Sequence, residues 1–366
     1  MDIRIDKTNL VRILQMVQGI VERRTTIPIL ANILIEAKAK QIEVKATDLE
    51  VFIRARCDAT VKEEGGITLG ARKLFEIVKE LPEGEVEMTT KDGGRINIRG
   101  GKARFSIVGM PTGEFPSFPS YNEELLSPIE PIHIREMIDK TVFAASTDET
   151  RHNMNGVFFE KEGDKVKMVA TDGHRLALVE RGGGEGLRVD RGVIIPRKGV
   201  LELMRLLDEK QGGCAIGFTG NMAILKREDT VFITRLIDGE FPDYKQVIPK
   251  GNERIVTINR ERLLGALRRV SLLSPERIRA VRFNLSKERL ELFSNNPDLG
   301  EAREEIEVDY KGEGMEIGFN ARYIMDALEV MRQEEVILEL KDQLSPALLK
   351  PFAEEGYLYI VMPVRI

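Results

Sequence analysis

The amino-acid sequence predicts an α+β fold of three repeated domains, each made of two β-α-β-β-β halves. The first observation is a short motif, written ATDLE, ATDGH and SNNPD in its three copies. Its copies place Thr47, Thr171 and Asn295 at a constant spacing of 124 residues. A second set of helix-like segments begins, with almost the same spacing, at Ala71, Pro196 and Asn320. Two markers that keep one spacing across three units indicate an internal repeat.

The first domain is expected to cover residues 1–119. It begins with a helix over residues 7–20, in which Leu10, Val11, Leu14 and Val17 are expected on one stripe, as in an amphipathic helix. A hairpin-like segment follows over residues 33–55, and a second helix over residues 71–81 is entered from the strand ITLG. The segments RINIRG and GKARFSIVG then read as edge strands, because both carry several basic side chains.

The second and third domains repeat this order over residues 128–250 and 253–366. Their helices are expected over residues 133–146, 197–208, 259–271 and 320–331, and alternating strands follow each helix. Because proline blocks the continuation of a strand, the segments GEFPSFP at Gly113 and GEFPDYKQVIP at Gly239 are expected to link the domains. The third domain ends in the apolar strand YLYIVMPVRI.

The composition is typical of a globular protein of the cytoplasm. Hydrophobic residues make up 42% and charged residues 31% of the 366 residues. No apolar run approaches the ~20 residues of a membrane span, and the N-terminus lacks the apolar segment of a secretory signal. Cys57 and Cys214 lie far apart without metal-ligand spacing, so we expect reduced thiols. The sequence indicates no cofactor and no metal site.

Charge is divided unevenly between the predicted helices and the remainder of the chain. The six helices together carry a net charge of +6, whereas the whole chain carries −5, which leaves −11 for the remainder. If the helices share one face, that face attracts a polyanion although the protein as a whole is acidic. The alternative is that these Arg and Lys residues form only the solvated faces of ordinary helices.

The segment VATDGHRLALVE invites a catalytic interpretation, because Asp172 and His174 lie two residues apart. A hydrolase would need a nucleophile or a metal beside this pair. The sequence has no GxSxG motif, and His133, His152 and His174 show no metal-ligand spacing. The two sibling segments of the repeat also lack a histidine. We therefore expect no catalysis. Two competing hypotheses remain: a hydrolase that uses Asp172 and His174, and a peptide-binding scaffold that does not bind DNA.

Strands of opposite charge lie near opposite ends of the chain. The basic strands carry Arg95, Arg99, Lys102 and Arg104, whereas the segment GEAREE carries Glu301, Glu304 and Glu305. Such strands could pair head to tail between two copies, and heterologous contacts of this kind close into a ring when the angle permits. The alternative is that the charges only protect sheet edges against aggregation.

Four motifs, in order along the chain, carry a family likeness: ATDGHRLAL, PRKG at the start of a helix, FPDY and the terminal VMPVRI. Together with the triple repeat, they resemble the bacterial sliding clamp family, the beta subunits of the DNA polymerase III holoenzyme, over the whole chain. The resemblance implies the DNA-clamp fold, in which two chains join head to tail in a ring and duplex DNA threads the hole. It also implies a processivity factor of the replicative polymerase that is not an enzyme and is associated with the nucleoid.

The resemblance also implies which residues contact DNA and which form the dimer interface. DNA, bound without sequence preference, would be contacted by Arg24, Arg72, Lys73, Arg197 and Lys198. From charge alone, we add Arg12, Arg205, Arg268 and Arg269. The homodimer interface would join Phe105, Arg95, Lys102 and Arg104 of one chain to Leu272, Leu273, Glu301, Glu304 and Glu305 of the other.

The third implied site is a pocket that binds short extended peptides of polymerases, the clamp loader and repair proteins. Its residues would be Thr171, Gly173, His174, Arg175, Leu176, Pro242, Val247, Ser345, Ile360, Met362, Pro363, Val364 and Arg365. His174 and Arg175 are expected to shape the groove and anchor a peptide, while Asp172 holds the turn. Gln246 stands where some relatives have arginine, and Pro346 where some have serine. These two departures leave the fine peptide preference open.

Overall fold

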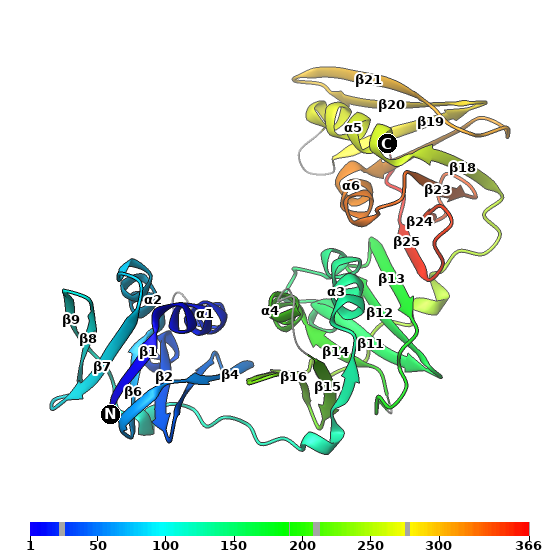
Figure 1. Cartoon of the computed structure of the whole chain (residues 1–366). Coiled ribbons are helices and arrows are strands. Elements are labelled where there is room, and N and C mark those ends of the chain that lie inside the picture. The colour runs from blue at the N-terminus through cyan, green and yellow to red at the C-terminus, as the bar shows by residue number, and fades with distance from the viewer. Residues whose placement is uncertain (22–25, 190, 208–212, 275–278, 366) are drawn as a thin grey trace. The chain divides into compact units, whose positions relative to one another are not determined.

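The computed structural model describes residues 1–21, 26–189, 191–207, 213–274 and 279–365. The described residues confirm the α+β fold and the β-α-β-β-β pattern of each half (Figure 1). The first half of the first domain contains β1 (Asp2–Asp6), α1 (Lys7–Gln18), β2 (Asn32–Lys38), β3 (Gln41–Thr47), β4 (Val51–Asp58) and the additional short β5 (Thr60–Glu63). The second half contains β6 (Gly65–Gly70), α2 (Ala71–Glu80), β7 (Glu85–Lys91), β8 (Arg95–Gly100) and β9 (Ala103–Val108).

The next two domains repeat this order. The second contains β10 (Ser127–Ile129), α3 (Pro131–Asp139), β11 (Gly156–Glu162), β12 (Lys165–Thr171) and β13 (Arg175–Arg181), then β14 (Val193–Pro196), α4 (Arg197–Leu207), β15 (Cys214–Thr219), β16 (Met222–Arg227) and β17 (Thr230–Arg235). The third contains β18 (Arg254–Asn259), α5 (Arg260–Val270), β19 (Ala280–Ser286), β20 (Arg289–Asn296) and β21 (Gly300–Glu307), then β22 (Met315–Asn320), α6 (Ala321–Val330), β23 (Glu335–Leu340), β24 (Ala347–Pro351) and β25 (Tyr357–Val361).

The sheets continue across the domain limits. One eight-stranded sheet has the order β10-β15-β16-β17-β4-β3-β2-β6, and the other has the order β14-β11-β12-β13-β25-β24-β23-β18. Because neighbouring domains share sheets, the chain packs as two compact units whose border passes through the second domain. The first unit comprises Met1–Pro131, Gly186–Arg188 and Leu201–Leu236, and the second comprises Ile132–Glu185, Val189–Val200 and Ile237–Ile366.

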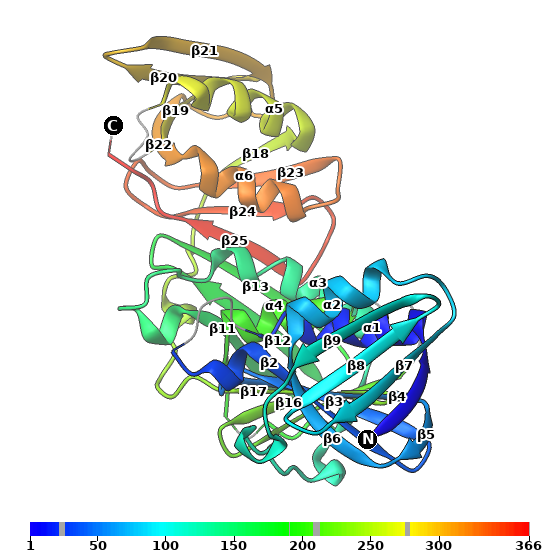
Figure 2. The ribbon, with the colours of Figure 1, turned by 90° about the vertical axis from the view of Figure 1, so that its left-hand side faces the viewer.

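Each unit also contains one smaller sheet. The first unit holds the five-stranded sheet β5-β1-β7-β8-β9, and the second holds the four-stranded sheet β21-β20-β19-β22. Helices α1 and α2 contact each other in the first unit, and α5 and α6 do so in the second (Figures 1 and 2). In the second unit, α5 also packs against β20 and β21. The expectation that β8 is an edge strand was wrong, because β8 lies between β7 and β9, and only β9 forms the edge.

Side-chain caps explain where several helices begin. The Asp6 carboxylate accepts hydrogen bonds from two amides of the first turn of α1, and the Asn259 and Asn320 side chains cap α5 and α6 in the same way. The helix expected over residues 133–146 was too long, because α3 ends at Asp139. After it, the Thr141 amide bonds the carbonyl of Ile138, three residues back, so the helical hydrogen-bond pattern tightens and stops.

A return segment covers the first strand of the second half in every domain. Thr68 of β6 bridges Met110, and Ile194 of β14 bridges Ile237. In the third domain, the amide of Val364 donates to the carbonyl of Gly318 in β22, at 2.9 Å. The C-terminal tail is therefore the third copy of a segment that links domains in the first two copies. Among the described residues, no helix is long and apolar enough to cross a membrane.

Candidate functional site

The turn between β12 and β13 is held together by side-chain hydrogen bonds. The Asp172 Oδ1 atom accepts from the amides of His174 and Arg175, at 2.9 and 3.0 Å. The Thr171 hydroxyl donates to the Arg175 carbonyl at 2.6 Å and accepts from the amide of Gly173. Gly173 has a φ of 87°, a conformation that favours glycine. Asp172 thus stabilises the turn, as the sequence predicts, and the side chain of His174 is exposed.

The Arg175 side chain connects this turn to the third domain. Its guanidinium donates to Oδ2 of Asp172 at 3.1 Å, to Oδ2 of Asp326 in α6 at 2.6 Å and to the carbonyl of Phe143 at 2.7 Å. It also lies over the ring of Tyr323, 4.4 Å from the centroid. Arg175 is therefore engaged by partners within the chain, and these contacts hold β13 beside α6. The sequence prediction missed Asp326 and Tyr323, since no local spacing relates them to Arg175.

An open cavity of about 730 Å³ lies beside the turn. Asp172, His174, Arg175 and Tyr323 line it, and so does Arg197 at the start of α4. Further basic residues of its lining are Arg151, Arg279 and Arg322. Four carboxylates line the cavity as well, those of Asp148, Asp172, Asp326 and Glu329, so its lining is rich in charges of both signs with arginine slightly in excess.

The C-terminal segment lies beside the same turn. β25 is paired with β13, with Arg175 opposite Val361, and the amide of Met362 then donates to the carbonyl of His174 at 2.9 Å. Together with the bond from Val364 to β22, this contact holds Met362, Pro363 and Val364 between two elements. Met362 remains 40% exposed, and Arg365 is exposed as well. Flexible methionine side chains adapt well to varied apolar ligands.

An apolar cluster underlies the start of β13 and the end of β25. Leu176 and Ile360, both predicted pocket residues, belong to it, and its other buried members are Val169, Leu178, Tyr244 and Leu348. Phe241, which precedes the predicted Pro242, stacks on Phe158 with the ring centroids 4.8 Å apart. Val247 is 48% exposed, in the same segment. The apolar cluster therefore lies close to the surface at a place where hydrophobic side chains remain uncovered.

The two departures from the family pattern have defined surroundings. The Gln246 amide group donates to Oδ2 of Asp243 at 2.8 Å, so this side chain folds back on its own turn. The Ser345 hydroxyl donates to Oδ2 of Asp342 at 2.7 Å. Hydrogen bonds from Ser345 and from the backbone lower the pKa of Asp342. Gln246 is thus built into a local turn, and so is Ser345, the residue directly before Pro346.

The predicted DNA-contacting residues lie on helices, except Arg24, which lies outside the described residues. Arg12, Arg72, Lys73, Arg205, Arg268 and Arg269 are exposed, whereas Arg197 and Lys198 are half-buried. Arg205, Arg268 and Arg269 lie in the last turns of their helices, where cations interact favourably with the helix dipole. Several have acidic neighbours in the chain, since Lys73 pairs with Glu76, Arg205 with Glu202, Arg268 with Glu329 and Arg269 with Glu304.

The predicted interface residues lie on two edge strands or directly beside them. Phe105 and Arg104 are on β9, the edge of the five-stranded sheet, and Arg95 lies opposite Val108 on the neighbouring β8. Lys102 is exposed in the turn between these strands. Glu301, Glu304 and Glu305 are on β21, the edge of the four-stranded sheet. Leu272 is 77% exposed in a short helical turn that contacts β21, and Leu273 beside it is half-buried.

These edges differ from the other long edges of the sheets. Strands β6, β14 and β18 are each covered by a β-bridge, and β22 by the C-terminal tail. Within the described ranges, no such bridge covers β9 or β21. A long uncovered edge is a template for pairing with another chain. The first unit thus presents a basic free edge and the second unit an acidic one.

Comparisons with known proteins agree with these observations along the whole chain. Residues 1–119 match the sequence model of the DNA polymerase III beta subunit, N-terminal domain, residues 128–243 match the central domain, and residues 245–365 match the C-terminal domain. Beta sliding clamps of Pseudomonas putida and Escherichia coli are 37% and 35% identical over 367 residues, with 100% of both chains covered. A crystal structure of a sliding clamp from Pseudomonas aeruginosa, bound to griselimycin, is similar with a TM-score of 0.95 and 36% identity, again over 100% of both chains.

Proposed function

Because the chain belongs to the family of DNA polymerase III beta subunits, the beta sliding clamps, we propose that two copies close head to tail around duplex DNA. The chain is a processivity clamp for a replicative DNA polymerase, and its family is non-catalytic. The observation that carries the proposal is the pair of free edge strands, β9 and β21, with opposite charges. Joining them would extend the five-stranded sheet of one copy into the four-stranded sheet of the other, twice per ring.

The proposed interface has an apolar centre and a charged rim. Phe105 of one copy and Leu272 of the other are exposed in the single chain and would be buried by pairing. Arg104 would then approach the carboxylates of β21. Apolar burial supplies most of the affinity in such an interface, while complementary charges fix the partner and the orientation.

We propose that the helices bind DNA weakly and without sequence preference. The ion pairs of Lys73, Arg268 and Arg269 lie at the surface, where water screens them, so a phosphate can replace the carboxylate at little cost. A ring that encloses DNA needs no tight contacts, and weak exchangeable contacts permit sliding. The acidic remainder of the chain would keep DNA away from the other surfaces.

A second proposed site binds peptides of polymerases, the clamp loader and repair proteins. The apolar cluster with Leu176 and Ile360 would receive hydrophobic side chains, and the exposed Val247 and Met362 would close over them. The neighbouring cavity, with its arginines, would receive an acidic or polar residue of the same peptide. We also propose the domain limits 1–119, 128–250 and 253–366, and a location in the cytoplasm on the nucleoid.

Retention on DNA tests the ring. The chain would be loaded by its cognate clamp loader onto a nicked circular plasmid, and bound protein would be separated from free protein by gel filtration. We expect retention on the circle and loss after a single restriction cut, because a topological link ends when DNA has ends. Equal retention before and after the cut would contradict encirclement. Primer extension by the cognate polymerase, with and without the clamp, separates this function from that of a peptide-binding scaffold.

A further inference from the structure

The pairing of β13 with β25 has no connecting turn to fix its register. The two strands come from the second and third domains, and they align Arg175 with Val361 and Val179 with Tyr357. A shift by one residue would turn Ile360 away from the apolar cluster and would move Met362 away from His174. The geometry of the proposed peptide pocket therefore depends on this register. The turn-side end of the pair is held by Arg175, as described above.

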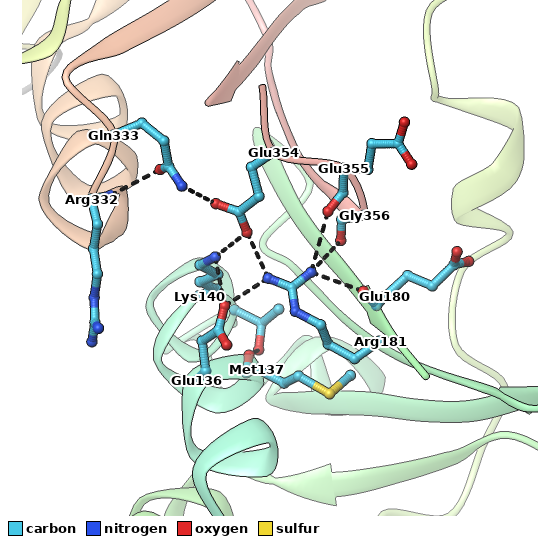
Figure 3. A network of polar contacts seen from close by, with 11 residues as sticks. Glu136, Met137, Lys140, Glu180, Arg181, Arg332, Gln333, Glu354, Glu355 and Gly356 are labelled. Atoms are coloured by element: carbon cyan, nitrogen blue, oxygen red, sulfur yellow. Dashed lines mark hydrogen bonds and ion pairs between the residues drawn. The ribbon is translucent and has the colours of Figure 1, made fainter. Parts of the chain in front are cut away.

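A partly buried ionic network, in which Lys140 is buried and Glu136 is 31% exposed, holds the opposite end of the same pair (Figure 3). Arg181, the last residue of β13, donates to Oε1 of Glu136 in α3 and to Oε1 of Glu354 in the loop before β25, at 2.6 Å each. Lys140, which directly follows α3, donates to the same two carboxylates, at 2.8 and 2.5 Å. Two cations and two anions thus alternate around one centre. Gln333, which follows α6, completes the set by donating to Glu354 at 2.5 Å.

The network continues the backbone ladder of the two strands. The amide of Glu180 donates to the carbonyl of Gly356 at 2.6 Å, one step beyond the pair of Val179 and Tyr357. The Arg181 guanidinium donates to the carbonyl of Glu180, and at 3.4 Å to the carbonyls of Glu355 and Gly356. Figure 3 shows the guanidinium pointing into the loop between these groups. Arg181 therefore contacts both the side chains and the backbone that would have to move in a register shift.

Because these charged side chains are shielded from water, each one depends on its partners in the network. The side chain of Lys140 is only 6% exposed and lies over the ring of Tyr357, 5.2 Å from its centroid. The side chains of Arg181 and Glu354 are 19% and 17% exposed. A buried charge that loses its partner is costly, so an alternative register that separates these groups is strongly disfavoured. Buried ionic groups are known to select one register among several in coiled coils, and the same physics applies here.

We propose that Arg181, held by Glu136 and Glu354, sets the register between β13 and β25 and thereby positions the C-terminal wall of the peptide pocket. Arg181 is a positioning residue, since it lies at the far end of the strand pair from Met362. This proposal rests on the proposed peptide-binding function for its consequence. Its structural part, the register, can be measured without any peptide.

The test compares three variants of the full-length chain. Arg181→Met removes the positioning group and leaves an excess buried carboxylate. Arg181→Met combined with Glu354→Gln removes one cation and one anion, so that Lys140 and Glu136 remain as a balanced pair at 2.8 Å. Lys165→Met is the matched control, because Lys165 pairs with Glu180 next to Arg181 but is 55% exposed.

Three measurements are made on each variant, and the first is the melting temperature of thermal unfolding. Amide hydrogen exchange of Met362 reports the bond to His174 and thus the register. Fluorescence anisotropy measures affinity for the tightest binder among labelled peptides tiled across the cognate polymerase. For Arg181→Met, we expect a lower melting temperature, exchange faster by about 100-fold and affinity weaker by about tenfold or more. Lys165→Met should leave all three unchanged.

The double variant separates register from simple stability. We expect its melting temperature to return towards that of the wild type, because the charges are balanced again, while fast exchange and weak binding persist. Wild-type exchange and affinity in the double variant would overturn the proposal, and so would protected Met362 in Arg181→Met. If no peptide binds the wild type, the proposed peptide function fails, yet hydrogen exchange still decides the role of Arg181.

Discussion

Replacement of Leu272 by alanine is expected to weaken the dimer strongly while leaving the folded chain intact. Leu272 is 77% exposed in the single chain, so about three-quarters of the residue remains to be buried by a partner. Leu→Ala removes three carbon atoms, which at ~0.8 kcal/mol for each CH₂ and three-quarters burial amounts to about 2 kcal/mol per interface. A head-to-tail dimer has two such interfaces. The loss is therefore about 4 kcal/mol per ring, or roughly 10³-fold in the dissociation constant.

Sedimentation equilibrium over a wide concentration range measures this constant directly. Leu272→Ala should shift the monomer–dimer midpoint upwards, and the additional change Leu273→Ala should give monomers throughout the accessible range. Ile132→Ala is the control, since Ile132 is also exposed, at 61%, but lies on α3 and not on β9, β21 or the short helical turn beside β21. Urea unfolding of each monomer should change by no more than about 0.5 kcal/mol, as for other surface substitutions. An unchanged dissociation constant for Leu272→Ala, or an equal effect of Ile132→Ala, would refute the assigned interface.

Three other changes probe the turn, the tail and the ionic network. Deletion of Met362 to Ile366 should abolish peptide binding in anisotropy while the dimer persists in sedimentation; retained affinity would place the pocket elsewhere. Asp172→Ala should lower the free energy of unfolding by about 1–3 kcal/mol in urea, because two amides lose their acceptor, whereas Asp172→Asn keeps an acceptor oxygen and should cost less. Burial opposes the ionised form of Glu136, but hydrogen bonds from Lys140 and Arg181 prevail and lower its pKa to about 2. Its contribution to stability is therefore present above pH ~4.3 and lost as pH falls towards 2, so Glu136→Gln should flatten the dependence of unfolding free energy on pH in that range; an unchanged slope would contradict this assignment.

The parts of the fold that the sequence predicts well are those with a local signal. The constant spacing of 124 residues located the repeats, and the stripe of Leu10, Val11, Leu14 and Val17 located the first helix. All of these residues except the half-buried Val11 are buried in α1. The end of α3 was missed because the residues after Asp139 keep an apolar pattern while their hydrogen bonds tighten. Apolar periodicity describes which face is buried but does not report how the backbone hydrogen bonds end.

The parts that could not be predicted depend on residues that are distant in sequence. The partner of Arg175 is Asp326, which lies 151 positions further along the chain, and Lys140 meets Glu354 across 214 positions. Neither pair has a spacing that distinguishes it from the many other Lys, Arg, Asp and Glu residues. Thr171 and Asp172, at the start of the candidate site, could be predicted as turn residues because a turn is formed by residues that are neighbours in the sequence. Their connection to the third domain required the sheet that β13 and β25 share.

The three return segments, which include Met110, Ile237 and Val364, differ in what constrains their sequences, and this bears on how many partners a ring could bind. Two copies, those that include Met110 and Ile237, must continue into the next domain, so their sequences are constrained by connectivity. The copy that includes Val364 joins no two of these three domains, although it makes a similar backbone bond to its own domain. One of the three return segments is therefore not constrained by linking these domains. This segment can acquire a role in recognition. A ring of two such polypeptides would have two equivalent binding sites. Two partner proteins could therefore bind the ring at the same time, and they could exchange places without leaving the DNA.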